Sequence, residues 1–190
     1  MTKLVVSTLA LAAVLAAAAG YVALVPPHPA DTAAGGSAAA RPLWTEVQWP
    51  FPMDQWGTGR AFACKAADCG SAVALYLRSK LGACNCATGV ETDADLDRMS
   101  DFDLIGGEVS PLAIGRPITI GWMKGRSRAY TPTGGNRDKS ILSVVFNDRC
   151  DMIVATVVLP AGRPAAIEPG VIDFLSSQPM LHWAELELGI

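Results

Sequence analysis

The chain has 190 residues, of which 51% are hydrophobic and 17% charged, and its formal net charge is -3. This composition excludes a disordered chain, a coiled coil and a generally basic nucleic-acid binder. The length corresponds to about one domain, and much of the hydrophobic excess lies before residue 26. The remainder therefore has the composition of an ordinary globular domain.

Residues 4–25 form an uncharged, hydrophobic segment. As a helix it would span about 33 Å, enough to cross the roughly 30 Å hydrocarbon core of a bilayer. Because Lys3 precedes it, the positive-inside tendency keeps the N-terminus in the cytoplasm and exports the following chain. The sequence predicts a retained single-pass anchor in a bacterial inner membrane. The alternative is a signal peptide cleaved after the alanines at 17–19, which would release the protein into the periplasm.

Residues 26–42 consist largely of alanine, glycine and proline, and they cannot bury enough surface to fold. We expect a flexible tether, which suits a retained anchor better than a secreted protein. The predicted organisation is a signal or anchor helix at 1–25, a tether at 26–42 and one periplasmic α+β domain at 43–190.

Aromatic residues are dense at the start of this domain, where Trp44, Trp49 and Trp56 stand among prolines. The prolines exclude a helix interior and favour extended chain. This pattern predicts an edge strand and a loop whose aromatic side chains cover the core. The alternative is an exposed aromatic surface, formed by the same three tryptophans, that binds a protein, peptide or carbohydrate.

The five cysteines are Cys64, Cys69, Cys84, Cys86 and Cys150. Disulfides are the default in an exported domain, and an odd number leaves one thiol over. Apolar spacing predicts a helix over residues 71–81, with Asp68 or Ser71 as its N-cap and Gly82 as its C-cap. Such a helix is about 16 Å long, whereas the Cα atoms of a disulfide lie within about 7 Å. The helix would therefore keep the first two cysteines away from the next two.

The expected pairing is a local Cys64–Cys69 bridge, with Cys150 bonded to either Cys84 or Cys86 and the other left free. Two alternatives involve the closely spaced cysteines 84 and 86. A Cys-x-Cys disulfide closes a small, strained ring and would be redox-labile, and soft thiolates suit Cu(I) or Zn(II). We expect no cofactor, and the alternative is copper on Cys84, Cys86 and His182. His182 is also the only histidine of the domain that could activate a cysteine nucleophile.

Six acidic residues lie between residues 91 and 103 and suggest a calcium loop. An EF-hand is excluded because Arg98 stands at the glycine position and Leu104 at the position of the bidentate acid. The better interpretation is a short helix that Thr92 caps and in which Asp95 completes a capping box.

The second half of the chain has β character. Residues 116–123 alternate Ile118, Ile120 and Trp122 on one face, and two further strands are predicted at 141–146 and 152–159. Residues 147–151 are expected to form a hairpin loop, and 131–139 a polar connection. A helix is predicted at 171–177, after a Pro-Gly pair, while 181–188 fits a strand or a helix. The fold class is α+β: an antiparallel meander with a few helices on one face.

One strand segment carries a basic stripe, which we define as Lys124, Arg126, Arg128 and Tyr130. These side chains share one face of an extended chain, and two further cations, Arg137 and Lys139, follow. The stripe predicts a surface that binds a phosphate, a carboxylate, anionic lipid or an acidic protein partner. The alternative is a solvated hairpin face whose charges protect a sheet edge. Residues 125–129 only partly match a nucleophile elbow, so no catalytic residue is predicted.

Residues 49–70 and 76–90 resemble a group of exported proteobacterial proteins of unassigned function. That resemblance implies export and brings no activity. The order of strands followed by a late helix at 171–179 is loosely similar to the sandwich of the photosystem-associated PsbP/Mog1-like proteins. This second resemblance concerns the fold alone.

The leading functional hypothesis is a membrane-tethered periplasmic accessory module, stabilised by disulfides. It would contact the membrane through residues 4–25, dock a membrane complex or envelope protein, and bind no nucleic acid. The alternative is a periplasmic thiol protein, a copper or redox chaperone that uses Cys84 and Cys86. A third hypothesis, an envelope enzyme, has no candidate catalytic residue in the sequence.

Overall fold

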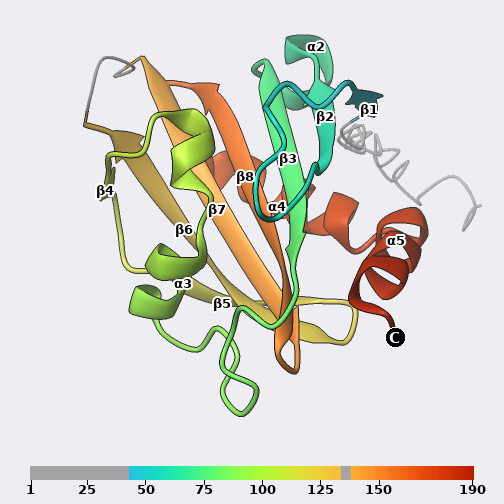
Figure 1. The fold of residues 1–190 in the computed structure, drawn as a ribbon. Helices are drawn as coiled ribbons and strands as arrows, with labels where there is room; N and C mark the ends of the chain where they lie inside the picture. The colour runs from blue at the N-terminus through green and yellow to red at the C-terminus, as the bar shows by residue number, and fades with distance from the viewer. Residues whose placement is uncertain (1–42, 134–137) are drawn as a thin grey trace, which may run out of the picture. The chain divides into compact units, whose positions relative to one another are not determined.

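The computed structural model describes residues 43–133 and 138–190 (Figure 1). The predicted anchor and tether lie outside these residues, and so does Arg137 of the predicted cationic segment. None of the helices in the described part is long and apolar enough to cross a membrane.

Eight antiparallel strands form one sheet in the order β1-β2-β3-β8-β7-β6-β4, with β5 also paired to β6. The strands are β1 (Trp44–Val47), β2 (Arg60–Cys64), β3 (Val73–Lys80), β4 (Val109–Pro111), β5 (Arg116–Ile120), β6 (Met123–Pro132), β7 (Lys139–Asp148) and β8 (Asp151–Pro160). Two runs of consecutive strands, β1 to β3 and β6 to β8, join where β3 pairs with β8. The expected single meander is therefore wrong: the sheet contains one long-range pairing at its centre.

Helices cover both faces of this sheet. They are α2 (Ala66–Cys69), α3 (Asp93–Met99), the 3₁₀ helix η1 (Phe102–Ile105), α4 (Pro164–Leu175) and α5 (Gln178–Leu188). Figure 1 shows α4 behind the sheet and α3 in front of it. The expectation of helices on one face is wrong because the central strand β7 is buried on both faces, from Ser140 through Phe146, and both faces need cover. The described domain is α+β, as predicted.

Strand β3 replaces the helix predicted over residues 71–81. Val73, Leu75 and Leu77 are buried at a spacing of two, and the strand pairs with β2 on one side and β8 on the other. A central strand also buries residues of its second face, which blurs the difference between strand and helix periodicity. The proposed caps are wrong too, because Asp68 belongs to α2 and Gly82 lies in the turn that follows β3.

A hairpin interrupts the single strand that was predicted over residues 116–123. Ile120 pairs with Met123, so Gly121 and Trp122 form the turn, and Gly121 adopts the left-handed φ of 58°. Trp122 is 44% exposed and does not continue the face of Ile118 and Ile120. The next hairpin, between β7 and β8, confirms the predicted loop: Asp148 pairs with Asp151.

The C-terminal segment forms two helices. Helix α4 begins at Pro164 and contains Pro169, so the expected start after Gly170 is wrong. Pro169 removes one backbone hydrogen bond, and apolar burial at a spacing of four holds the helix on the sheet. The ambiguous segment 181–188 is helical and belongs to α5. The buried apolar residues of the two helices are Ile167, Val171, Leu175, Met180, Ala184 and Leu188.

Candidate functional site

The basic stripe of β6 lies beneath α3. The register with β7 places Lys124, Arg126, Arg128 and Tyr130 on one face, as the sequence predicted. Helix α3 covers this face and carries two acids, Asp93 and Asp97, that the stripe engages. Arg126 and Arg128 are therefore neutralised inside the protein, and Lys124 is exposed with no ion pair among the described residues.

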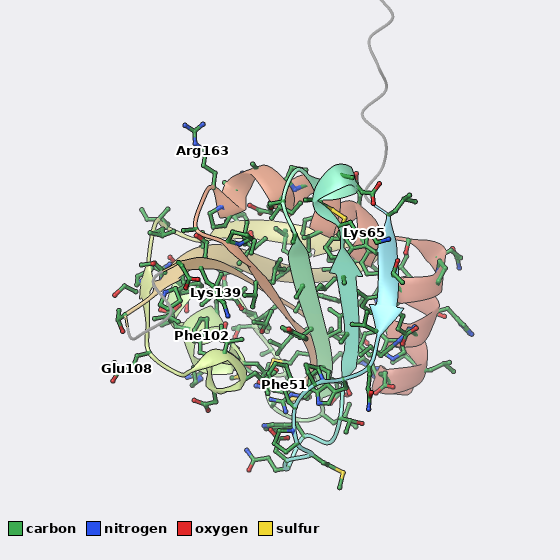
Figure 2. All side chains as sticks on the ribbon, turned by 90° about the horizontal axis from the view of Figure 1, so that it is seen from above. Phe51, Lys65, Phe102, Glu108, Lys139 and Arg163 are labelled. Carbon is green, nitrogen blue, oxygen red and sulfur yellow. A yellow bond between two sulfur atoms is a disulfide. The ribbon has the colours of Figure 1, made fainter. Side chains whose placement is uncertain are left out.

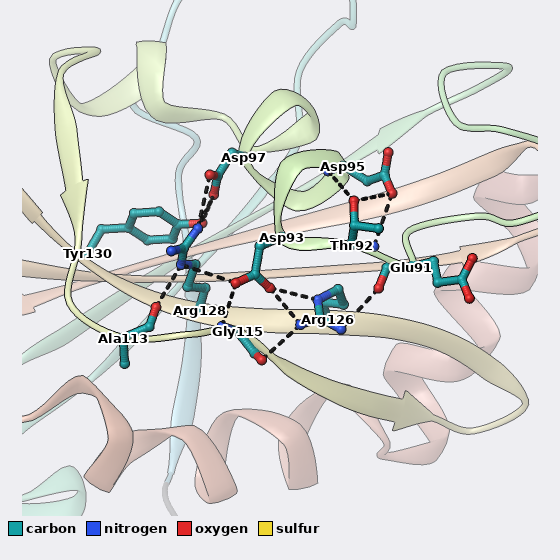
Figure 3. A network of polar contacts seen from close by, with 10 residues as sticks. All are labelled: Glu91, Thr92, Asp93, Asp95, Asp97, Ala113, Gly115, Arg126, Arg128 and Tyr130. Atoms are coloured by element: carbon teal, nitrogen blue, oxygen red, sulfur yellow. Dashed lines mark hydrogen bonds and ion pairs between the residues drawn. The ribbon is translucent and has the colours of Figure 1, made fainter.

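Arg126 binds several groups of the covering segment at once (Figure 3). Its Nη2 lies 2.6 Å from Asp93 Oδ1 and donates to the carbonyl of Gly115 at 2.8 Å. Its Nη1 donates to the carbonyl of Glu91 at 3.0 Å. The backbone N–H of Gly115, together with Arg126, holds the pKa of Asp93 below its ordinary value. The planar guanidinium, with five donors, is the side chain suited to such a junction.

Arg128 forms a second junction one turn of α3 further on. Its Nη1 lies 3.0 Å from Asp97 Oδ2, and its Nε donates to the carbonyl of Ala113 at 2.8 Å. The hydroxyl of Tyr130 donates to Asp97 as well. Burial, followed by the hydrogen bond to this carboxylate, raises the pKa of Tyr130 well above its ordinary range. The phenol therefore stays protonated and serves as a donor.

Helix α3 is placed by a capping box at its start. Thr92 accepts from the backbone N–H of Asp95 at 3.1 Å, and the Asp95 carboxylate accepts from the N–H of Thr92 at 3.0 Å. This confirms the predicted helix and cap. Because Asp93 and Asp97 are four residues apart, they share the helix face that meets the stripe. This pairing was not predicted from the sequence, although the spacing of the acids and that of the cations can both be read there.

The network fixes the last residue of β4 and the connection from it to β5, which together we call the 111–115 segment. Arg128 holds its carbonyl at Ala113, Arg126 holds the carbonyl of Gly115, and the N–H of Leu112 donates to the carbonyl of Ala129 at 2.8 Å. Leu112 is 52% exposed and Ile114 is 82% exposed. Two apolar side chains are thus presented to solvent from a backbone that is held on both sides.

A second polar cluster lies on the same sheet face, at β3. Arg78 makes a two-pronged ion pair with Asp101, at 3.1 and 2.6 Å, and a third bond to Asp54 at 2.5 Å. Lys80 lies 2.7 Å from Asp101 and 5.6 Å from the ring centre of Trp56. The bond from Arg78 lowers the pKa of Asp54 below its ordinary value. These groups line a cavity of about 690 Å³, but every buried charge in it already has a partner.

Both expected disulfides are present, as Cys64–Cys69 and Cys86–Cys150. Cys84 is the free cysteine of the described residues and is buried. Its thiol donates to the carbonyl of Arg149 at 3.2 Å, and burial raises its pKa. Cys86, by contrast, is exposed. Cys64 and Cys69 are separated from Cys84 and Cys86, as expected. The separating element is strand β3 and not a helix.

The copper set of Cys84, Cys86 and His182 is not assembled in this disulfide-bonded form. Cys86 is bonded to Cys150, and His182 lies on α5, 65% exposed and 3.3 Å from Glu185. Within the described ranges, no three His, Cys, Asp or Glu side chains gather in a way that could hold a metal ion.

The three tryptophans lie in different places. Trp44 stacks on Phe174 of α4 at 5.2 Å, whereas Trp49 makes an edge contact with Tyr76 at 6.1 Å, on the α3 side of the sheet. Trp56 lies beside Lys80. Each is half-buried. Trp44 confirms the edge strand whose aromatic residue covers the core.

Comparison with known proteins gives one loose match. No protein-family model matches the chain, and no curated protein sequence matches it. Among solved structures, the solution structure of cyanobacterial PsbP (CyanoP) from Synechocystis matches with a TM-score of 0.44 and 14% sequence identity, over 70% of this chain and 78% of that one. Such a match carries no argument about function. The resemblance to exported proteobacterial proteins stays a prediction.

Proposed function

We propose that this chain is a membrane-tethered accessory module of the bacterial envelope, whose domain lies in the periplasm and docks a membrane complex or envelope protein. The hydrophobic segment at 4–25 and the tether at 26–42 support membrane attachment. The two disulfides support an oxidising compartment.

The 111–115 segment carries the docking proposal. Leu112 and Ile114 are exposed, while Arg126 and Arg128 hold the backbone on which they stand. An apolar side chain on a fixed backbone loses less conformational freedom when a partner covers it, so more of the burial energy becomes affinity. The partner is a protein with an apolar cleft that accepts these two side chains.

Co-purification of the full chain from its native membrane tests this surface. We expect Ile114→Glu, combined with Leu112→Glu, to remove the partner, because a buried carboxylate without a counter-charge is costly. Leu81→Glu is the matched control, since Leu81 is also an exposed leucine and lies in the turn after β3. Unchanged co-purification in the double variant would overturn the docking surface. Lys124→Glu tests whether the basic stripe also contributes to docking, because Lys124 is exposed and forms no ion pair with the described residues. Unchanged co-purification in this variant would exclude that contribution.

Membrane attachment has a separate test. We expect the full chain to stay in the membrane pellet after alkaline carbonate washing and its intact mass to include residues 1–19. A soluble protein that lacks these residues would establish the cleaved form instead.

The second candidate function is a thiol protein, favoured by the buried Cys84 thiol beside the half-buried Cys150 end of the Cys86–Cys150 disulfide. The backbone N–H of Cys84 donates to the carbonyl of Cys150 at 3.2 Å, so the two residues are neighbours. In the exchange step Cys84 loses its proton and its sulfur attacks Sγ of Cys150. The Cys84–Cys150 bond forms, the Cys86–Cys150 bond breaks, and Cys86 leaves as a thiolate that takes up a proton.

Trapping with iodoacetamide followed by peptide mapping without reduction tests this exchange. The thiol function predicts a population with a Cys84–Cys150 disulfide and alkylated Cys86, absent in Cys84→Ser. A single Cys86–Cys150 disulfide under all conditions would exclude exchange. A copper-chaperone function requires reduced Cys86, because this residue is bonded to Cys150 in the oxidised protein. Cu(I) binding by the reduced protein that is lost on replacing Cys84, Cys86 or His182 would support that function.

A further inference from the structure

An apolar cavity lies on the α3 side of the sheet, apart from the 111–115 segment, and it has a volume of about 330 Å³. Its floor spans three neighbouring strands through Tyr76 of β3, Val158 of β8 and Ile141 of β7. Phe51 and Leu104 belong to its walls. This volume lies near the lower end of the range of roughly 300–1,000 Å³ that is typical of ligand pockets.

The walls are held in place before any ligand arrives. Phe51 packs edge-on against Tyr76, with ring centres 4.8 Å apart. On the other side, Phe102 of η1 packs against Tyr130 at 4.7 Å, which fixes the short helix that contributes Leu104. A preformed apolar cavity binds more tightly than one that must first be ordered.

Two polar groups at this cavity have no polar partner among the described residues. The Tyr76 hydroxyl makes no hydrogen bond with any other described residue, and burial alone acts on its pKa, which it raises. Lys139, which lines the same cavity, has no ion pair within the described part of the chain. On the same face, the cations of β3 and the two arginines of the stripe all pair with acids. Figure 2 labels Lys139 and Phe51 on the ribbon. The cavity therefore combines apolar walls with an available hydroxyl donor and an available cation.

We propose that this cavity binds a small apolar molecule that ends in a carboxylate. The apolar part packs on Ile141, Val158 and Phe51, because these side chains make up the floor and one wall. Lys139 selects the negative charge, and the Tyr76 hydroxyl donates to an oxygen of the ligand. A phenol and an ammonium group without partners among the described residues match a carboxylate, which only accepts hydrogen bonds.

Three probes of nearly equal size and different charge test this assignment: 3-phenylpropionate, 3-phenylpropanol and 3-phenylpropylamine. Each is titrated calorimetrically into the full chain in lipid nanodiscs, with empty nanodiscs as the blank. We expect the acid to bind at least about fivefold more tightly than the amine, the difference that a partly exposed ion pair supplies. Equal affinities, or binding of none of the three, would overturn the proposal.

Variants locate the site. Lys139→Gln should weaken binding of the acid and leave the alcohol unchanged, whereas Tyr76→Phe should weaken both. Val158→Phe should fill the cavity and abolish binding of all three probes; Leu104→Trp does the same from the wall if the first variant does not fold. Lys65→Gln is the control, because Lys65 is exposed beside α2 and lines no part of this cavity (Figure 2). An unchanged acid affinity in Lys139→Gln, or persistent binding in the filled cavity, would contradict the assignment.

Discussion

One guanidinium group, that of Arg128, connects three parts of the molecule. It joins β6 to Asp97 of α3 and to the carbonyl of Ala113, and its Cζ lies 5.7 Å from the ring centre of Tyr130. Its side chain is only 14% exposed. Removing it leaves the carbonyl of Ala113 without this donor and leaves Asp97 without its cation, with Tyr130 still donating to that carboxylate, so its effect extends beyond one ion pair.

We expect Arg128→Ala to destabilise the domain by about 2 kcal/mol, in the range for a partly buried, charge-assisted hydrogen-bond network. Arg128→Lys should recover only part of this, because lysine lacks the planar fork that bonds Ala113 through Nε and Asp97 through Nη1. Urea unfolding measures the change, and exposed Arg163, replaced by alanine, is the control (Figure 2). An equal stability of the two alanine variants would show that the network is energetically neutral.

Thr156, unlike Arg128, is a buried polar residue whose side chain has no partner among the described residues. It is completely buried between Tyr76 and Ser143, and its hydroxyl has no hydrogen-bond partner in the described residues. We expect Thr156→Val to raise the unfolding temperature by about 3 °C, because an unpaired buried hydroxyl costs about 1 kcal/mol. Ser143→Ala is the matched comparison: its hydroxyl bonds to Ser100 at 2.6 Å, so this variant should lose stability. A lower unfolding temperature for Thr156→Val, measured by circular dichroism, would contradict the prediction.

At the scale of elements, α3 is the part that joins the charged face of the sheet to the segments around it. It has seven residues, too few to be stable alone. Its capping box and its two inward acids therefore decide whether it stays on the sheet. Thr92→Ala should cost about 1 kcal/mol, the usual value of an N-cap, and should also loosen the 111–115 segment. Hydrogen exchange of the Gly115 amide, which bonds to Asp93 at 2.9 Å, reports this loosening.

The contribution of Asp93 to the stability of the domain should decrease as the pH falls. The Gly115 N–H and then Arg126 lower its pKa below the ordinary value of 3.8. The stabilisation is therefore complete above pH 3.8 and is lost as the pH falls through the lower folded-state pKa. We expect the difference in unfolding temperature between the wild type and Asp93→Asn to narrow on acidification below this value. A constant difference from neutral pH down to pH 2 would refute it.

Local features could be predicted from the sequence, whereas most long-range ones could not; the bridge to Cys150 was expected, but with two possible partners. The capping box of α3, the β7–β8 hairpin and the local Cys64–Cys69 bridge all depend on neighbours in sequence. Strand β3 was mistaken for a helix because its partner β8 lies about 80 residues further on, and burial on both faces hides its period. The ion pairs of the stripe were missed for the same reason: Asp93 and Arg126 are 33 positions apart.

For the whole molecule, the two disulfides differ in what they constrain. The Cys64–Cys69 bridge closes a short loop, with a sequence separation of 5, whereas the Cys86–Cys150 bridge has a separation of 64. By reducing the entropy of the unfolded chain, the first bridge should stabilise the domain by about 2 kcal/mol and the second by about 4 kcal/mol. The Cys86–Cys150 bridge also connects the loop after β3 to the hairpin before β8. Strands β3 and β8 are the two that pair at the centre of the sheet.

We expect Cys86→Ala/Cys150→Ala to lower the free energy of unfolding by about twice as much as Cys64→Ala/Cys69→Ala. Denaturant unfolding of the oxidised proteins measures this, and alkylation before and after unfolding checks the thiols. The wild type should show one thiol, Cys84, that reacts only once the domain unfolds, since it is buried in the native state. Equal losses from the two double variants would contradict the entropic account.

The pairing of β3 with β8 has a consequence for the order in which the domain matures. If the exported part of the chain crosses the membrane in sequence order, the edge of β3 stays uncovered until residues 151–160 emerge. During that interval Cys84 and Cys86 are already in the oxidising space while Cys150 is not, so premature bridges among the four earlier cysteines compete with the native one. Correct maturation then depends on reopening such bridges, and a cell without a disulfide isomerase should accumulate mispaired forms of this protein.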